Sequence, residues 1–227
     1  MATLYIVGTP IGNLEDVTLR ALRVLREADI ILCEDTRVTR RLLEKYEITG
    51  KQLIAYNEQK SGVSAERVIG LLQEGKSIAL VTDAGTPGIS DPGSRLVQKV
   101  RVALPEVKIE SVPGPSALTA ALSVAGVSAD NFLFLGFLPH KKGRETRFKE
   151  IADTKRVVVF YESPHRILKT LSALSRYSTI YRTITVCREL TKIYEEVKRG
   201  AAAELLLHFQ NNPDKVRGEF VVIVSSD

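Results

Sequence analysis

The chain has 227 residues, of which 44% are hydrophobic and 26% are charged, with a formal net charge of +5. This balance is typical of globular proteins and excludes disordered and fibrous classes, and the length suits one large domain or two small ones. Apolar runs are too short to span a membrane, and we expect no signal peptide. Two isolated cysteines indicate a reducing cytoplasm without a disulfide framework.

Short apolar strands alternate with amphipathic helices from end to end of the chain. Alternation of this kind predicts βαβ units and a largely parallel sheet, which places the chain in the α/β fold class. The first half is expected to contain strands at residues 4–7, 30–33, 53–56, 78–82 and 107–112, and helices at residues 17–28, 36–46, 64–74, 94–103 and 116–125.

A turn-rich segment, residues 126–131, interrupts this pattern. It predicts a boundary between an N-terminal α/β domain, residues 1–126, and a C-terminal α/β domain, residues 127–227. The second domain is expected to contain strands at residues 132–137, 157–161, 183–187 and 220–225, helices at residues 166–177 and 202–209, and a basic segment that reaches Lys149.

Glycine and proline cluster where three of the expected strands end. Residues 8–13 follow the first strand, residues 83–93 follow the fourth, and residues 113–117 follow the fifth. In open α/β sheets, ligands bind outside the carboxyl ends of the strands, where glycine lets the backbone approach a ligand closely. Three such loops at one sheet edge predict a binding crevice, and the alternative is a set of tight turns with no ligand.

Two common nucleotide-binding motifs are not supported. Residues 70–77 match the spacing of a Walker A loop, but here a helix precedes the glycines and a strand follows, which is the reverse of what phosphate binding requires. Gly75 is interpreted as a helix C-cap. Gly8 and Gly12 do not form the glycine pattern of a dinucleotide site. The histidines are scattered, so no metal site is predicted, and His208 is interpreted as a helix surface residue.

Acidic side chains also follow strands. Glu34 and Asp35 come directly after the second expected strand, and Glu58 follows the third. Asp35 would suit a helix N-cap, but capping alone does not explain two like charges side by side. Glu34 and Asp35 are therefore expected to face the crevice.

The net positive charge of the chain lies in its second half. Residues 1–112 carry fifteen Lys/Arg and fifteen Asp/Glu, whereas residues 113–227 carry seventeen Lys/Arg and twelve Asp/Glu. A basic half favours a polyanionic partner, although it can also serve solubility alone. Basic side chains cluster at residues 37–41 and 140–149, where they either contact RNA phosphates or form a solvated surface.

Several of these loops together resemble a known family. The stretch from Gly8 to Ala21 resembles the opening signature of the ribosomal small-subunit RNA (cytidine-2′-O)-methyltransferases, which belong to the tetrapyrrole methylase superfamily. The resemblance covers essentially the whole chain. Further motifs follow in the family's order at residues 33–37, 83–93, 113–117, 136–139, 161–166 and 188–192.

The resemblance implies two α/β domains with S-adenosylmethionine in the cleft between them, a homodimer, and a cytidine ribose of 16S ribosomal RNA as substrate, either in naked RNA or in the assembled small subunit. No metal is implied. The residues that it implies for donor binding are Pro10, Asp83, Gly85, Thr86, Pro113, Gly114, Ser116, Ala117, Tyr161, Glu189 and Leu190. For proton removal or substrate orientation we expect Glu34, Asp35 and Glu58, and for RNA contacts Arg37, Arg40, Lys141, Lys142, Arg144 and Arg166.

Two alternative functions stay open at this point. The first is a methyltransferase of the same superfamily that acts on a corrin-type ring or on a protein, and an anionic tetrapyrrole could also use the basic residues. The second is a non-enzymatic RNA-binding protein that keeps only the fold, and it would show no donor binding.

Overall fold

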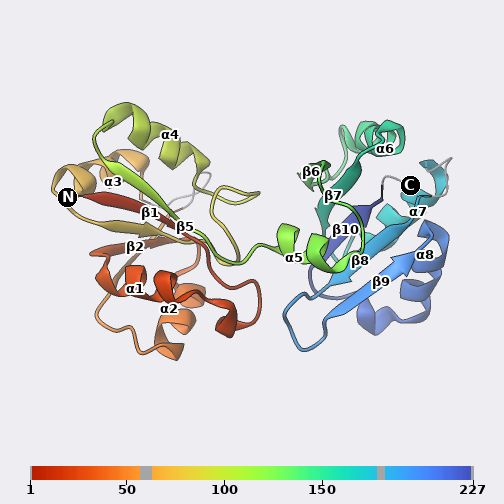
Figure 1. Ribbon diagram of the computed structural model, residues 1–227, viewed down its shortest axis with the longest axis horizontal. Helices are drawn as coiled ribbons and strands as arrows, with labels where there is room; N and C mark the ends of the chain where they lie inside the picture. Colours follow the sequence, from red (N-terminus) through yellow and green to blue (C-terminus); the bar gives the residue numbers. More distant parts are fainter. Residues whose placement is uncertain (1, 57–62, 178–181, 226–227) are drawn as a thin grey trace. The chain divides into compact units, whose positions relative to one another are not determined.

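The computed structural model describes residues 2–56, 63–177 and 182–225. The chain forms two compact units, Met1–Ser116 and Ala117–Asp227 (Figure 1). The division falls after Ser116 rather than after residue 126, because helix α5 (Ala117–Val124) packs against strand β10 (Phe220–Val224) of the second unit.

The first unit is a five-stranded parallel sheet with helices on both faces (Figure 1). The strand order is β3-β2-β4-β1-β5, so β4 is central and lies between β2 and β1. The strands are β1 (Thr3–Val7), β2 (Ile30–Cys33), β3 (Gln52–Ala55), β4 (Ile78–Leu80) and β5 (Lys108–Val112). The helices are α1 (Leu19–Glu27), α2 (Thr36–Lys45), α3 (Ala65–Gln73) and α4 (Ser94–Ala103), with a short 3₁₀ helix at Leu14–Asp16.

Apolar side chains alternate between two cores, one on each face of this sheet. Ile31 packs with α1 and α2, whereas Ile30 and Leu32 pack with α3 and α4. Because successive side chains of a strand point to opposite faces, a strand covered on both faces is apolar throughout. The continuous apolar run of β2 is buried at all four positions for this reason.

The helices of the first unit begin where polar side chains cap them. Thr18, Asp35 and Ser64 precede α1, α2 and α3, and each accepts a hydrogen bond from a backbone N–H of the first turn. Helix α3 ends at Gln73 with Glu74 as its C-cap, one residue before the position interpreted from the sequence. Gly75 follows the cap with a left-handed φ of 86°, the conformation that commonly ends helices. Strand β4 then follows this helix, so the segment lacks the strand–loop–helix order of a phosphate-binding loop.

The second unit has a mixed sheet, and here the expectation of a largely parallel sheet is wrong. Among the described residues of this unit, only β6 and β7 pair in parallel, while β7, β10, β8 and β9 pair antiparallel in that order. The strands are β6 (Phe132–Phe137), β7 (Val157–Glu162), β8 (Ile184–Arg188), β9 (Glu196–Gly200) and β10. The remaining helices are α6 (Arg144–Asp153), α7 (Ile167–Tyr177) and α8 (Ala202–Asn211), with a 3₁₀ helix at Pro213–Lys215.

The core of the second unit lies between the sheet and helices α6, α7 and α8. Phe160, Val222 and Phe209 are buried there together. Strand β9 was not expected from the sequence because it is a charged edge strand, and charged side chains on an edge oppose pairing with another chain. The sequence predicted a basic loop where the structure has helix α6, because the charged residues of this helix show no clear apolar periodicity. Among the described residues, no helix combines the length and apolarity needed to cross a membrane.

Candidate functional site

The glycine- and proline-rich loops of the first unit meet at one edge of its sheet. Strands β4, β1 and β5 are neighbours and parallel, so their carboxyl ends, and the loops that follow, lie side by side. The backbones of Thr9 and Gly85 exchange hydrogen bonds of 2.8 and 3.1 Å, and Gly8 N donates to Val112 O at 3.0 Å. Thr86 Oγ1 donates to Pro115 O at 3.2 Å. The expected proximity of the three loops is therefore confirmed.

Two glycines allow the closest approach between these loops. A Cβ atom on Gly8 would lie 2.8 Å from Gly114 N, and a Cβ atom on Gly114 would lie 2.9 Å from Gly8 O. Both contacts are with backbone, which cannot move aside as a flexible side chain can. Glycine is thus required at both positions for loop packing, independently of any ligand.

The loop after β4 holds several residues in left-handed backbone conformations. Gly85, Gly88 and Gly93 have φ values of 82°, 85° and 134°. Ser90 in the same loop has a φ of 63°, which is unfavourable for a residue with a side chain. Backbone strain of this kind clusters at ligand-binding loops. Here Gly88 N donates to Pro92 O at 3.2 Å, which closes the turn that contains Ser90.

Asp83 lies at the start of this loop and is half-buried. Its Oδ1 accepts a hydrogen bond of 2.9 Å from the backbone N–H of Asp35, so the ends of β4 and β2 are joined. Burial, together with the nearby negative charge of Asp35, raises the pKa of the Asp83 carboxyl above its ordinary value. A half-buried carboxylate among backbone loops is suited to accept hydrogen bonds from a ligand.

Asp35 caps helix α2, as its position suggested. Arg37 donates from its backbone N to Asp35 Oδ1 at 2.8 Å and from Nη2 to Oδ2 at 2.6 Å. The hydrogen bonds from the Arg37 side chain and backbone lower the pKa of Asp35 to about 2. Glu34 is half-buried beside it, whereas Arg37 and Arg40 are exposed on α2. Glu58 lies outside the described residues.

The other first-unit residues predicted to bind the donor surround these loops. Pro10 is buried, Pro113 is exposed, and Gly114 and Ser116 are half-buried. Ala117, half-buried as the first residue of α5, belongs to the second unit. The structure thus brings Pro10, Asp83, Gly85, Thr86, Pro113, Gly114 and Ser116 to one edge of the first sheet.

Tyr161, Glu189 and Leu190 lie in the second unit, at strand ends. Tyr161 is half-buried on β7, with its ring 5.1 Å from that of Phe134. Glu189 follows β8 with a φ of 50° and accepts hydrogen bonds from Lys192 Nζ at 2.8 Å and from a backbone N–H at 2.9 Å. Although burial acts in the opposite direction, these bonds hold the pKa of Glu189 below its ordinary value. Leu190 is buried.

The residues predicted to contact RNA in the second unit fall into two groups. Lys141 and Lys142 are exposed in the loop before α6. Arg144 and Arg166 instead form ion pairs of 3.0 and 2.8 Å with Glu162, which is 1% exposed. Their guanidinium groups are turned toward the protein interior, a geometry that favours positioning of the loop over direct contact with RNA.

Glu162 was not singled out from the sequence. Its carboxylate also accepts hydrogen bonds from Thr170 Oγ1 at 2.6 Å and from Ser163 N at 2.8 Å. Glu162 and Arg166 are four residues apart in a motif that ends a strand, and this spacing could have predicted their ion pair. The second partner, Arg144, comes from a distant segment and could not be predicted in this way. We call Glu162, Arg144, Arg166 and Thr170 the Glu162 cluster.

His208 is not a plain surface residue, which corrects the sequence interpretation. Its side chain is 18% exposed, and its Nε2 lies 3.0 Å from Glu196 Oε1, an atom that Lys215 also contacts at 2.9 Å. The pair joins α8 to β9 and lies outside the loops that form the candidate site. Within the described part of the chain, no three His, Cys, Asp or Glu side chains are grouped as metal ligands would be.

Comparisons with known proteins agree with this architecture. A sequence model of the family described as Tetrapyrrole (Corrin/Porphyrin) Methylases matches residues 3–206. Ribosomal RNA small subunit methyltransferase I of Thermotoga maritima is 46% identical over 99% of both chains. The protein of that name from Mesorhizobium japonicum is 45% identical over 97% of this chain and 74% of its own length.

Solved structures share the fold at lower identity. A diphthine synthase has a TM-score of 0.74 at 16% identity and covers 99% of this chain and 90% of its own. A cobalt precorrin-4 methyltransferase of cobalamin biosynthesis has a TM-score of 0.70 at 20% identity, with coverages of 99% and 96%. With the family model matching most of its length and relatives above 40% identity, the chain belongs to the tetrapyrrole methylase family.

Proposed function

We propose that this protein is an S-adenosylmethionine-dependent methyltransferase that methylates the ribose 2′-hydroxyl of a cytidine in 16S ribosomal RNA. The observation that carries the proposal is the identity of 46%, over nearly the full length of both chains, to a protein named ribosomal RNA small subunit methyltransferase I. The resemblance of the loop motifs to the family supports the same substrate. The proposal includes a cytoplasmic homodimer that acts on ribosomal RNA or the assembled small subunit.

The strand-end loops suit the donor chemically. S-adenosylmethionine carries ribose hydroxyls, an ammonium group and a sulfonium cation, and when bound it supplies the methyl group to the acceptor oxygen. Asp83 offers a half-buried carboxylate as a hydrogen-bond acceptor, and the loops around Gly85 and Gly114 bring backbone N–H and C=O groups close together. We propose that these loops hold the donor and orient it toward the acceptor hydroxyl.

The acceptor hydroxyl must lose a proton as the new bond to carbon forms, and a carboxylate can receive it. We propose Glu34 for this role. The pKa of Asp35, at about 2, makes its carboxylate a weak base, because Arg37 already stabilises the charge. Glu34 is half-buried at the end of β2, beside the segment that Asp83 contacts.

The experiment is methyl transfer from labelled S-adenosylmethionine to small ribosomal subunits that lack ribose methylation, with the product mapped by mass spectrometry. We expect one methyl group on a cytidine 2′-oxygen. Donor binding without methyl transfer would point to a different acceptor, such as a tetrapyrrole or a protein. Absence of donor binding would leave only the non-catalytic RNA-binding alternative.

The role of Glu34 has its own test. Glu34→Gln removes the base and should lower kcat on RNA at least tenfold, with little change in donor affinity measured by calorimetry. Asp35→Asn is the matched control, because it changes the neighbouring acid in the same way. Equal kcat values in the two variants would remove Glu34 from the mechanism.

A further inference from the structure

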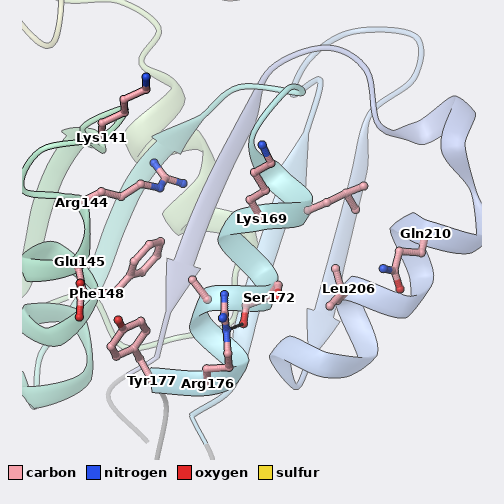
Figure 2. A pocket seen from close by; sticks show the side chains of 12 residues that line it. Lys141, Arg144, Glu145, Phe148, Lys169, Ser172, Arg176, Tyr177, Leu206 and Gln210 are labelled. Atoms are coloured by element: carbon pink, nitrogen blue, oxygen red, sulfur yellow. Dashed lines mark hydrogen bonds between the residues drawn. The ribbon is translucent and has the colours of Figure 1, made fainter.

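A groove of about 560 Å³ runs over the helical side of the second unit, between the loop before α6 and helices α7 and α8 (Figure 2). Figure 2 shows Lys141 and Arg144 on the α6 side, and Lys169, Ser172 and Arg176 along α7. Lys169, Ser172 and Arg176 were not among the candidate residues in the sequence. All the residues that line the groove belong to one unit.

The groove is electropositive. Its lining contains four cationic side chains and one acidic one, Glu145. Glu145 lies 3.5 Å from Lys149 Nζ, and Arg144 is paired with Glu162. Lys141, Lys169 and Arg176 have no carboxylate within ion-pair distance among residues 2–56, 63–177 and 182–225, so their charges are available to a ligand.

The spacing along α7 suits an extended ligand. Lys169, Ser172 and Arg176 are three and then four residues apart, so they lie on one face of the helix. At 1.5 Å per residue, the two cations are about 10 Å apart along the helix axis. A single small anion would not reach both, whereas a polyanion can contact both and also accept a hydrogen bond from the Ser172 hydroxyl.

The Glu162 cluster fixes the wall of the groove that carries Lys141. Arg144 Nη1 donates to Pro139 O at 3.0 Å, and Arg166 Nη1 donates to Leu138 O at 2.8 Å. The loop before α6 is therefore tied to a buried anion at two points. The rings of Phe148 and Tyr177 stack with centroids 5.9 Å apart, which joins α6 to α7. A surface held in this way loses little conformational freedom when it binds.

We propose that this groove binds the phosphate backbone of the ribosomal RNA, with Lys169, Arg176 and Lys141 as phosphate contacts and Ser172 as a hydrogen-bond donor. The inference rests on the proposed function, because it assigns a surface to that substrate. The unit that contains the groove holds the whole excess of positive charge, seventeen Lys/Arg against twelve Asp/Glu. Arg144 and Arg166 act as positioning residues that hold the loop rather than as contacts.

The test is the double variant Lys169→Glu/Arg176→Glu. Its affinity for a fragment of 16S ribosomal RNA, measured by fluorescence anisotropy at several salt concentrations, should fall at least tenfold. The slope of log K against log salt should decrease in magnitude by about 1 to 2, because two phosphate contacts are lost. Lys169→Arg should keep wild-type affinity. Lys76→Glu, an exposed charge reversal at the opposite end of β4 in the first unit, is the matched control.

Three measurements separate this proposal from the proposed function. Donor affinity should be unchanged in the double variant, and kcat/KM for RNA should fall with RNA affinity. Unchanged RNA affinity and an unchanged salt slope in the double variant would overturn the proposal that the groove binds RNA. Normal binding of naked RNA with weakened binding of the assembled subunit would overturn it in favour of an acidic ribosomal protein. If the wild type binds RNA through the groove but transfers no methyl group, the groove stands and the proposed function fails.

Discussion

The two units differ in how they hold their functional segments. The first carries fifteen basic and fifteen acidic residues, and its loops are joined by backbone hydrogen bonds between Thr9 and Gly85 and by the contact of Gly8 with Gly114. The second is basic, and its loop before α6 is held by side chains that converge on buried Glu162. The first unit thus fixes its loops through backbone contacts, whereas the second fixes its loop through buried ion pairs.

The largest effect is expected in the second unit, where removal of the Glu162 carboxylate should release the loop before α6. Glu162→Gln leaves Arg144 and Arg166 without their countercharge, and we expect a loss of about 3–5 kcal/mol in the free energy of unfolding. Urea unfolding measures it. The control is Glu150→Gln, which removes an exposed ion pair with Arg147 and should cost less than about 1 kcal/mol. Equal costs would mean that the Glu162 cluster does not hold the loop.

In the first unit, the corresponding test disturbs the backbone contact between Gly8 and Gly114. Gly114→Ala places a Cβ atom 2.9 Å from Gly8 O, and we expect a loss of about 1–3 kcal/mol together with weaker donor binding. Gly70→Ala is the control, because a Cβ atom there meets nothing within 4 Å and the position is helical. That variant should gain up to about 1 kcal/mol. Urea unfolding measures the change in stability, and calorimetry measures donor affinity. A Gly114→Ala variant with unchanged stability would contradict the close approach of the two loops.

Asp83→Asn should affect donor binding and folding stability in opposite directions. The pKa of Asp83 in the folded protein lies above its ordinary value of 3.8, so the contribution of this one carboxyl to stability falls as the pH rises from 3.8 through its folded pKa. The variant keeps an oxygen for the Asp35 N–H but avoids the buried charge. We expect it to be slightly more stable than the wild type at pH 7, with no such advantage at pH 3, and to bind the donor more weakly.

Unfolding curves at the two pH values and calorimetry with S-adenosylmethionine check this prediction. A variant that is less stable than the wild type at pH 7 would show that the Asp83 carboxylate is stabilised by its surroundings. Unchanged donor affinity would remove Asp83 from the proposed site.

The smallest expected effect compares the two units directly through their thiols. Cys33 lies in β2 and Cys187 in β8, both fully buried, and burial raises the pKa of each, that of Cys187 to about 12. Neither should react with a thiol reagent at pH 8 in the native protein. In Glu162→Gln, Cys187 should react faster while Cys33 stays protected. Equal acceleration at both thiols, read by mass spectrometry, would show that the units unfold together.

Local pattern was sufficient for most of the first unit. Its strands, its cap at Asp35, and the loops at Gly85 and Gly114 follow from apolar runs, a capping residue and glycine, all of which act over a few residues. The reversed order of helix and strand around Gly75 also excluded a phosphate-binding loop before the fold was known. Family motifs along the chain, and not spacing, were needed to propose a donor and a substrate.

Local patterns of residues were enough to predict the α/β class, the positions of most elements and the loops that carry the candidate site. The folded structure was needed for three features: the strand order that places β2, β4, β1 and β5 side by side, the antiparallel pairing in the second sheet, and the convergence of Arg144 and Arg166 on Glu162. The reason is physical: capping and periodicity involve neighbouring residues, whereas strand pairing and buried ion pairs join residues far apart in the chain, and many pairings are compatible with one local pattern.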